Sequence, residues 1–394
     1  MATSSKKNIL LTYRDIWNID ESLPLYKTLS PKVNFIKYKI TTKHDFKRFL
    51  ENSTINGWWI NEEFFDLLGN PSDYWNQYPE SLKAILVPWV GCEFIDGAKL
   101  WKEKQILLCN IGNNAATNVA DMAIFLTISC FRLTTAWEYC LRFLEHGDIK
   151  NCKTYIGGSD KPQLTMWTRD SDAEHVSIQM PSKVNYSSSD KQVFNMHNNY
   201  TILGKELESP TNKNVLILGF GAIGRNIGKR LHYCFDAHIY YFKRSGAVHP
   251  SSLNYPAHYC PSLTDRTTWE NIDLIVLSLP SNKDSNDLIC TKTLAMCKNG
   301  VRIVNVGRGS CINEEDLIDA LNTGKVSSCG LDVYKDESKP IKKELLERID
   351  ITLMPHIGSD VKDMIERQTV ATLENIEDIF LHNGKGKYTI NLPK

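Results

Sequence analysis

The chain has 394 residues, which at about 100–200 residues per domain predicts two or three domains. Apolar residues make up 42% of it and charged residues 23%, a composition that excludes a disordered or fibrous protein. Its 46 Lys and Arg residues equal its 46 Asp and Glu residues in number, so no overall positive charge favours nucleic acid or an anionic membrane.

The 11 cysteines show no Cys-x-x-Cys spacing, and several lie inside apolar runs. This pattern predicts buried, reduced thiols rather than disulfides or a zinc site, and the ten histidines show no metal-ligand spacing either. We therefore expect no metal. The apolar run at 122–131 is too short to span a bilayer, and the N-terminus predicts no secretory signal, so a cytoplasmic protein is expected.

The first 110 or so residues alternate strand-like and helix-like segments, which predicts βα units and a parallel sheet. Strands are expected at 9–12, 33–36, 82–90 and 106–110, and a helix at 44–51. Trp58, Trp59 and Trp89 are candidates for either core or pocket residues, with core favoured for two of the three. A helix at 116–133 is apolar nearly all round, which predicts burial between two domains or two subunits.

The segment at about 150–200 has little periodicity and is interpreted as a long polar insertion. After it, nearly continuous apolar strands alternate with helices, which is typical of a doubly wound parallel sheet with both faces covered. Strands are expected at 214–218, 238–242, 272–279, 301–306 and 328–333, and helices at 222–233, 314–322 and 361–382.

A glycine-rich turn follows the first of these strands and opens a helix. In Gly219-Phe220-Gly221-Ala222-Ile223-Gly224, the first glycine permits a tight turn and the second lets a pyrophosphate approach the backbone. The third lets the helix and the strand pack closely. The N–H groups at the start of the helix then bind the pyrophosphate, so the turn predicts a dinucleotide.

The next strand ends at Phe242, where a carboxylate would be expected to bind the ribose of NAD. Lys243, Arg244 and Ser245 follow it instead. Two cations and a hydroxyl attract a 2′-phosphate, so NADP is predicted to be preferred, with NAD also accepted.

Three polar groups follow later strands of the same sheet. Arg308 lies in Asn305-Val306-Gly307-Arg308-Gly309, where a guanidinium is placed to pair with a substrate carboxylate. Asp332 to Glu337 follow the next strand, and His356 follows Pro355. A histidine has a pKa near neutrality, which suits acid–base chemistry.

These motifs together resemble the D-isomer-specific 2-hydroxyacid dehydrogenases, and most closely their glyoxylate/hydroxypyruvate reductase branch. The resemblance is dense from Gly204 to Ser359 and thinner upstream. It rests on the glycine turn and on the segments Asn305–Gly309, Gly330–Tyr334 and Pro355–Gly358. The first 80 or so residues match only in pattern.

The resemblance implies a catalytic triad of Arg308, Glu337 and His356, with the backbone N–H groups of Val90 and Gly91 binding the substrate carboxylate. It implies that Arg308 also binds this carboxylate and polarises the keto oxygen, and that a hydride passes from the reduced nicotinamide to the keto carbon. His356 then gives its proton to the developing alkoxide, and Glu337 raises the pKa of His356. Asp336 lies next to Glu337, and the proline that the family places after this glutamate is displaced.

The resemblance also implies a set of cofactor contacts and a homodimer. The expected cofactor-binding residues are Gly219, Gly221, Ala222, Ile223, Gly224, Lys243, Arg244, Ser245, Leu279, Pro280, Ser285, Val306, Gly307, Arg308, Asp332, His356 and Gly358. We expect a discontinuous, flavodoxin-like substrate-binding domain from residues 1–112 and 358–394, and a Rossmann-type dinucleotide-binding domain from residues 113–357. The insertion at about 150–200 is expected on or beside the dimer contact.

Two alternatives remain at this point. Formate dehydrogenases resemble this family but have a glutamine where Glu337 stands, so Glu337 disfavours them. A dinucleotide-sensing, corepressor-like binding protein can retain the triad, and binding of the cofactor without turnover of any 2-ketoacid would distinguish it.

Overall fold

The computed structural model describes residues 6–157, 168–169, 176–177 and 200–393, and most of the predicted insertion at 150–200 lies outside these ranges. The chain divides into two compact units. The terminal unit contains residues 1–116 and 359–394, and the central unit contains residues 117–358. The sequence places these boundaries a few residues earlier, after residues 112 and 357.

The terminal unit has a five-stranded parallel sheet in the order β2–β1–β3–β4–β5. This is the flavodoxin-like, doubly wound order, which confirms the predicted fold. Its strands are β1 (Lys7–Tyr13), β2 (Val33–Lys39), β3 (Gly57–Trp59), β4 (Ala84–Leu86) and β5 (Leu107–Cys109). The strand predicted at 82–90 is shorter because Pro88, which has no N–H group for a sheet, follows it closely.

Helices cover both faces of this sheet. One apolar core joins β1 to α12 through residues such as Leu11 and Ile376, and the other contains Phe46, Trp58 and Phe64. The helices are α1 (Pro24–Leu29), α2 (Lys43–Glu51), α3 (Glu63–Leu68), η1 (Pro71–Gln77), α4 (Gly97–Lys104) and α12 (Lys362–Leu381).

The central unit begins with the apolar helix α5 (Ala116–Arg132). Leu126 and Phe131 are buried, but Phe125 is 46% exposed and Ile128 37% exposed, so the described residues of the central unit leave part of this helix uncovered. After it come α6 (Thr134–Tyr139), η2 (Cys140–Leu144) and α7 (Ile149–Lys153). In the described part of the chain, no single helix can cross a membrane; one bent pair, α5 with the segment 134–144, satisfies the length and composition criteria.

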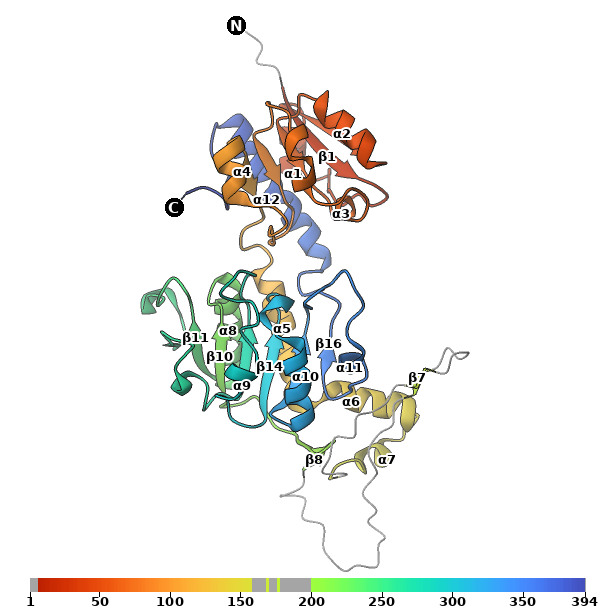
Figure 1. Cartoon of the computed structure of the whole chain (residues 1–394), viewed down its shortest axis with the longest axis vertical. Helices are drawn as coiled ribbons and strands as arrows, with labels where there is room; N and C mark the ends of the chain where they lie inside the picture. Colours follow the sequence, from red (N-terminus) through yellow and green to blue (C-terminus); the bar gives the residue numbers. More distant parts are fainter. Residues whose placement is uncertain (1–5, 158–167, 170–175, 178–199, 394) are drawn as a thin grey trace, which may run out of the picture. The chain divides into compact units, whose positions relative to one another are not determined.

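The sheet of the central unit has seven parallel strands in the order β12–β11–β10–β13–β14–β15–β16 (Figure 1). In chain order this is the Rossmann arrangement 3-2-1-4-5-6 with one strand added, and it confirms the predicted doubly wound sheet. The strands are β10 (Asn214–Leu218), β11 (His238–Phe242), β12 (His258–Tyr259), β13 (Leu274–Leu277), β14 (Val301–Asn305), β15 (Val326–Leu331) and β16 (Thr352–Leu353).

The remaining elements connect these strands. They are β6 (Thr168–Arg169), β7 (Val176–Ser177), β8 (Thr201–Ile202), β9 (Lys205–Glu206), α8 (Ala222–Phe235), η3 (Pro250–Ser252), η4 (Arg266–Thr268), α9 (Thr291–Leu294), η5 (Gly309–Cys311), α10 (Glu314–Thr323) and α11 (Lys343–Leu346). All 11 cysteines are free thiols, and nine of them are buried.

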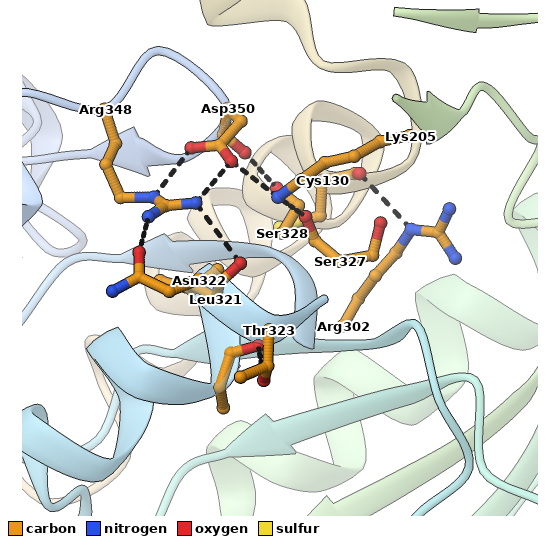
Figure 2. A network of polar contacts seen from close by, with 11 residues as sticks. Cys130, Lys205, Arg302, Leu321, Asn322, Thr323, Ser327, Ser328, Arg348 and Asp350 are labelled. Atoms are coloured by element: carbon orange, nitrogen blue, oxygen red, sulfur yellow. Dashed lines mark hydrogen bonds and ion pairs between the residues drawn. The ribbon is translucent and has the colours of Figure 1, made fainter. Parts of the chain in front are cut away.

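A buried ion network lies at the amino end of β15 (Figure 2). Lys205 Nζ lies 2.5 Å from Asp350 Oδ2, and Arg348 binds both oxygens of the same carboxylate at 2.9 and 2.7 Å. Lys205 also donates to the carbonyl of Ser327. Burial raises the pKa of Asp350, but the two positive charges outweigh it and hold this pKa below its ordinary value. The network therefore joins β9 to β15 and to the segment before β16, at the end of the sheet opposite the predicted site.

Candidate active site

The glycine turn between β10 and α8 has the geometry that a dinucleotide requires. Gly219 has a φ of +95°, and a Cβ atom there would lie 2.7 Å from the carbonyl oxygen of Ser278. A Cβ atom on Gly224 would lie 2.1 Å from the carbonyl oxygen of Gly219, so the helix can pack on the turn only without a side chain. At Gly221, by contrast, a Cβ atom would meet nothing within 4 Å. The open side of the turn thus lies at Gly221, where a pyrophosphate is expected.

The start of α8 adds donors to this opening. Gly221 is the N-cap residue, and no side chain caps the helix. Ala222 and Ile223 form its first turn, so their N–H groups point toward the end where an anion is stabilised. The residues present therefore fit a dinucleotide pyrophosphate.

Other predicted cofactor residues lie at the same edge of the sheet. β10 pairs with β13, which is the point where the strand order reverses and where such sheets bind ligands. A Cβ atom on Gly307 would lie 2.8 Å from the backbone of Leu279, so the loop after β14 lies against the loop after β13. Val306 is buried between β14 and this loop. Ser285 is also buried, and its hydroxyl donates to the carbonyl of Pro280 at 2.7 Å, so it shapes the loop from within.

The loop after β11 presents the predicted phosphate-binding cations. Arg244 is exposed, and its Nη1 lies 3.3 Å from Asp284 Oδ2 in the loop after β13. Lys243 and Ser245 flank it. No carboxylate stands at the end of β11, where Phe242 is the last residue. The positive side chains in the loop after β11 are therefore suited to an anionic group of a ligand.

Two members of the predicted triad are in direct contact. His356 Nδ1 lies 2.7 Å from Glu337 Oε2, and Glu337 Oε1 accepts a hydrogen bond from the backbone N–H of Tyr334 at 3.0 Å. The hydrogen bond from Tyr334 holds the Glu337 carboxylate in place, and this carboxylate orients the imidazole ring of His356. The other ring nitrogen of His356, Nε2, is then the atom available to a substrate.

The backbone of His356 is held in an unusual conformation. Its φ is +57°, in the left-handed region that side chains rarely adopt. Asp332 stabilises this turn, because its two carboxylate oxygens accept the N–H groups of Ile357 and Gly358, each at 2.9 Å. Asp332 and Gly358 thus also position the histidine, a role that the sequence pattern does not indicate, and their contact with the cofactor stays a prediction.

The contact between Glu337 and His356 changes both pKa values. The hydrogen bond to Glu337 raises the pKa of His356 above its ordinary value, although burial acts in the opposite direction. Burial raises the pKa of Glu337, but the hydrogen bonds from His356 and from the Tyr334 N–H, together with the nearby positive charges, outweigh it, so the net change is downward. The pair is therefore an ionised carboxylate beside an imidazole that favours its protonated form.

Asp336 does not take part in this pair. Its carboxylate lies 2.6 Å from Lys339 Nζ, and the hydrogen bond with Lys339 lowers the pKa of Asp336 to about 2. The sequence offers two adjacent acids, Asp336 and Glu337, and the structure brings Glu337, the predicted one, to His356.

Arg308 follows β14 and is partly buried. Asn305 closes its turn by donating to the carbonyl of Arg308 at 2.9 Å and accepting from the N–H of Gly307 at 3.1 Å. A Cβ atom on Gly309 would lie 1.8 Å from the carbonyl carbon of Tyr334, so this turn contacts the segment before Glu337. The positive charge of Arg308 lowers the pKa of both Glu337 and His356, so the three side chains are close enough for their charges to interact.

Val90 and Gly91 belong to the terminal unit, in the loop after β4. Asn110 Nδ2 donates to the carbonyl of Val90 at 2.8 Å and so holds this loop from behind. Within the ranges that the structure describes, neither backbone N–H has an acceptor. The binding of a substrate carboxylate by these two N–H groups stays a prediction.

A Rossmann unit, a flavodoxin-like unit and a carboxylate–histidine pair with a nearby arginine define a dinucleotide-dependent dehydrogenase. Residues 183–358 match the family described as D-isomer specific 2-hydroxyacid dehydrogenase, NAD binding domain. Over 391 residues, 98% of this chain and 97% of its relative, the chain is 52% identical to a Saccharomyces cerevisiae protein named "Putative 2-hydroxyacid dehydrogenase YPL113C". The chain belongs to the D-isomer-specific 2-hydroxyacid dehydrogenase family.

More distant relatives have more specific names. The chain is 34% identical to glyoxylate reductase 1 of Saccharomyces cerevisiae over 44% of this chain and 47% of that protein. Its fold is similar to a crystal structure of D-mandelate dehydrogenase from Rhodotorula graminis, with a TM-score of 0.77, 22% identity and 99% of each chain covered. By its membership of the family, which acts on small-molecule 2-hydroxyacids, the chain is an NAD(P)-dependent 2-hydroxyacid dehydrogenase.

Proposed function

We propose that the protein reduces a small 2-ketoacid of the glyoxylate or hydroxypyruvate type to the D-2-hydroxyacid. The observation that supports this best is the 2.7 Å contact between His356 Nδ1 and Glu337 Oε2, with Arg308 close enough to shift the pKa of both. The partial similarity to glyoxylate reductase 1 supports the choice of a small substrate.

Each group of the proposed site has a separate role in the reaction. Arg308 pairs with the substrate carboxylate and polarises the keto oxygen, and the N–H groups of Val90 and Gly91 bind the same carboxylate. The reduced nicotinamide, when bound, supplies the hydride. His356, protonated because Glu337 stabilises its positive charge, donates a proton to the oxygen as negative charge develops there. In the reverse direction the neutral imidazole accepts the proton.

We propose that the preferred cofactor is NADP. This proposal is supported by the exposed Arg244 and the neighbouring Lys243 in the loop after β11, and by the absence of a carboxylate from the last position of that strand, Phe242. Replacing Arg244 by Gln is expected to weaken NADPH binding roughly 10- to 100-fold, since a charge-assisted contact contributes about 1.5–3 kcal/mol, and to leave NADH binding nearly unchanged. Arg266→Gln, which removes another exposed arginine paired with Glu270, is the matched control. If Arg244→Gln weakened the binding of NADPH and of NADH equally, Arg244 would be only a surface charge.

We also propose a cytoplasmic homodimer. Support for the dimer lies in apolar side chains on neighbouring elements of the central unit that the described residues leave exposed. Phe125 on α5, Phe143 on η2 and Ile149 on α7 are all exposed. Such a surface is typical of a protein–protein contact.

The proposed activity is tested with a panel of 2-ketoacids, each offered with NADPH and with NADH, by following the absorbance of the reduced cofactor. We expect turnover of a small 2-ketoacid, faster with NADPH. Tight binding of either dinucleotide with no turnover of any 2-ketoacid would instead support a dinucleotide-sensing binding protein on the same fold.

A further inference from the structure

A buried asparagine, Asn110, lies directly after β5 in the terminal unit. β5 pairs with β4 in parallel, so the segments that follow these two strands lie side by side. The Asn110 side chain joins one segment to the other, because its Nδ2 donates to the carbonyl of Val90 at 2.8 Å. Val90 and Gly91 are the residues whose N–H groups are predicted to bind the substrate carboxylate. Asn110 therefore lies behind the predicted carboxylate-binding loop.

The contacts of Asn110 fix the orientation of its amide. The Oδ1 atom accepts the backbone N–H of Gly112 at 2.9 Å, so Nδ2 must be the atom that faces the Val90 carbonyl. The backbone of Asn110 is fixed as well, since its N–H donates to the carbonyl of Tyr388 at 3.1 Å and its carbonyl accepts Asn375 Nδ2 at 2.9 Å. The donor to the Val90 carbonyl is thus held in place on every side.

The hydrogen bond from Asn110 acts on the peptide group that contains the Gly91 N–H. The carbonyl of Val90 and the N–H of Gly91 belong to one planar trans peptide bond and point in opposite directions, so holding the carbonyl toward Asn110 directs the N–H away from it. A hydrogen bond to the oxygen also polarises the amide and makes its N–H a stronger donor. Cys92 Sγ lies 3.8 Å from the same oxygen, but a thiol is a weak donor. The direction and the strength of the Gly91 N–H as a donor therefore depend mainly on Asn110.

We propose that Asn110 is a positioning residue for substrate binding, which orients the Gly91 N–H toward the carboxylate of the 2-ketoacid and strengthens it as a donor. The inference rests on the proposed function and adds to it a residue that acts on the substrate only through the Val90–Gly91 peptide. A backbone N–H that is already oriented binds an anion more tightly than one that must first be ordered. Loss of the Asn110 amide should therefore weaken the binding of a carboxylate in particular.

The test compares two matched variants of the full-length protein, Asn110→Leu and Asn375→Leu. Asn375 is buried on α12 and, like Asn110, donates to one backbone carbonyl and accepts one backbone N–H, that of Tyr388. Leucine has a similar volume and neither group, so both variants lose the same kinds of hydrogen bond, but only Asn110→Leu loses the one to Val90. Asn110→Asp, which keeps the acceptor for Gly112 and removes the donor, takes the place of Asn110→Leu if that variant does not fold.

The measurement is the ratio of kcat/KM for glyoxylate to kcat/KM for methyl glyoxylate, which lacks the charged carboxylate, with a saturating reduced cofactor. A general loss of active protein lowers both values equally and cancels in this ratio. Asn110→Leu should lower the ratio roughly tenfold, the effect of losing one well-placed hydrogen bond to a charged group, and Asn375→Leu should leave it unchanged. Calorimetric titration with oxalate, a dicarboxylate without a keto group, should show a roughly tenfold loss of affinity in Asn110→Leu alone.

The outcomes separate this inference from the function on which it rests. No turnover of any 2-ketoacid by the wild type would overturn the proposed function, and the oxalate affinities would then decide the role of Asn110 by themselves. Equal ratios and equal oxalate affinities in the wild type and Asn110→Leu would overturn the inference alone. A similar loss in Asn110→Leu and Asn375→Leu would also overturn it, because Asn110 would then only stabilise the segment after β5.

Discussion

At the scale of single residues, proton transfer in the site depends on the carboxylate of Glu337 and the imidazole ring of His356. Glu337 is held by a backbone N–H and holds His356, while Asp332 fixes the left-handed turn that presents the ring. Left-handed backbone at a residue with a side chain costs of order 1–3 kcal/mol and tends to occur at functional sites. The strain at His356 is therefore consistent with a residue positioned for catalysis.

Replacing Glu337 by Gln is expected to lower the pKa of His356. Glu337 raises this pKa in wild type, so the reduction rate should stay high through neutral pH and fall as pH rises past the raised value. In the variant, the fall should begin at lower pH, while KM for the 2-ketoacid changes little. The measurement is kcat for reduction as a function of pH.

Asp336→Asn is the matched control, because it removes the adjacent carboxylate, which pairs with Lys339 instead. Its pH profile should coincide with that of wild type. If Asp336→Asn reproduced the shift and Glu337→Gln did not, the assignment of the two acids would have to be reversed.

Much of the site could be predicted residue by residue, and the exceptions have a physical reason. Gly219 and Gly224 are predictable because only glycine fits the left-handed turn and the backbone contact found there, and Gly221 because a side chain would fill the space that a pyrophosphate needs. The hydrogen bonds of Asp332 are not predictable, because they depend on how loops distant in sequence meet. A pattern of residue types contains no information on such contacts.

At the scale of elements, strand ends were predicted best where glycine or a charge ends an apolar run. β10 and β11 have the predicted bounds, whereas β15 begins two residues earlier than expected because Val326 continues the pairing with β14. The long helix α5 was correctly located, but its exposure could not be predicted, since it depends on what covers each face.

The network of Lys205, Arg348 and Asp350 should stabilise the central unit without affecting catalysis, because it lies at the opposite end of the strands. Asp350→Asn removes the negative charge that compensates the buried side chains of Lys205 and Arg348, and such a loss typically lowers the free energy of unfolding by about 3–5 kcal/mol. Urea unfolding at neutral pH measures this free energy. Glu270→Gln, which breaks a surface ion pair with Arg266, should change it little.

The same network predicts a dependence on pH. The pKa of Asp350 is lowered in the folded protein, so its contribution to stability is complete above the ordinary aspartate pKa of about 3.9 and is lost as pH falls below it. The difference in unfolding free energy between wild type and Asp350→Asn should therefore narrow in acid. A difference near zero at neutral pH would mean that the network adds no stability.

At the scale of the whole molecule, the uncovered apolar residues of the central unit predict self-association. Phe143→Asp places a charge on this surface and should convert a dimer into a monomer, as measured by light scattering, while leaving the glycine turn intact. Tyr233→Asp, at an exposed aromatic residue on α8, is a control that should leave the mass unchanged. A wild-type protein that is monomeric at micromolar concentration would contradict the proposed dimer.

The central claim is that His356 gives a proton to the substrate oxygen during reduction and takes it back during oxidation. It is tested most directly by measuring the wild-type rate in both directions between about pH 5 and pH 10. We predict that reduction falls and oxidation rises with increasing pH, with midpoints above the ordinary histidine pKa of about 6.5 because Glu337 stabilises the protonated ring. Rates that change in the same sense in both directions, or that do not change with pH, would contradict the assignment.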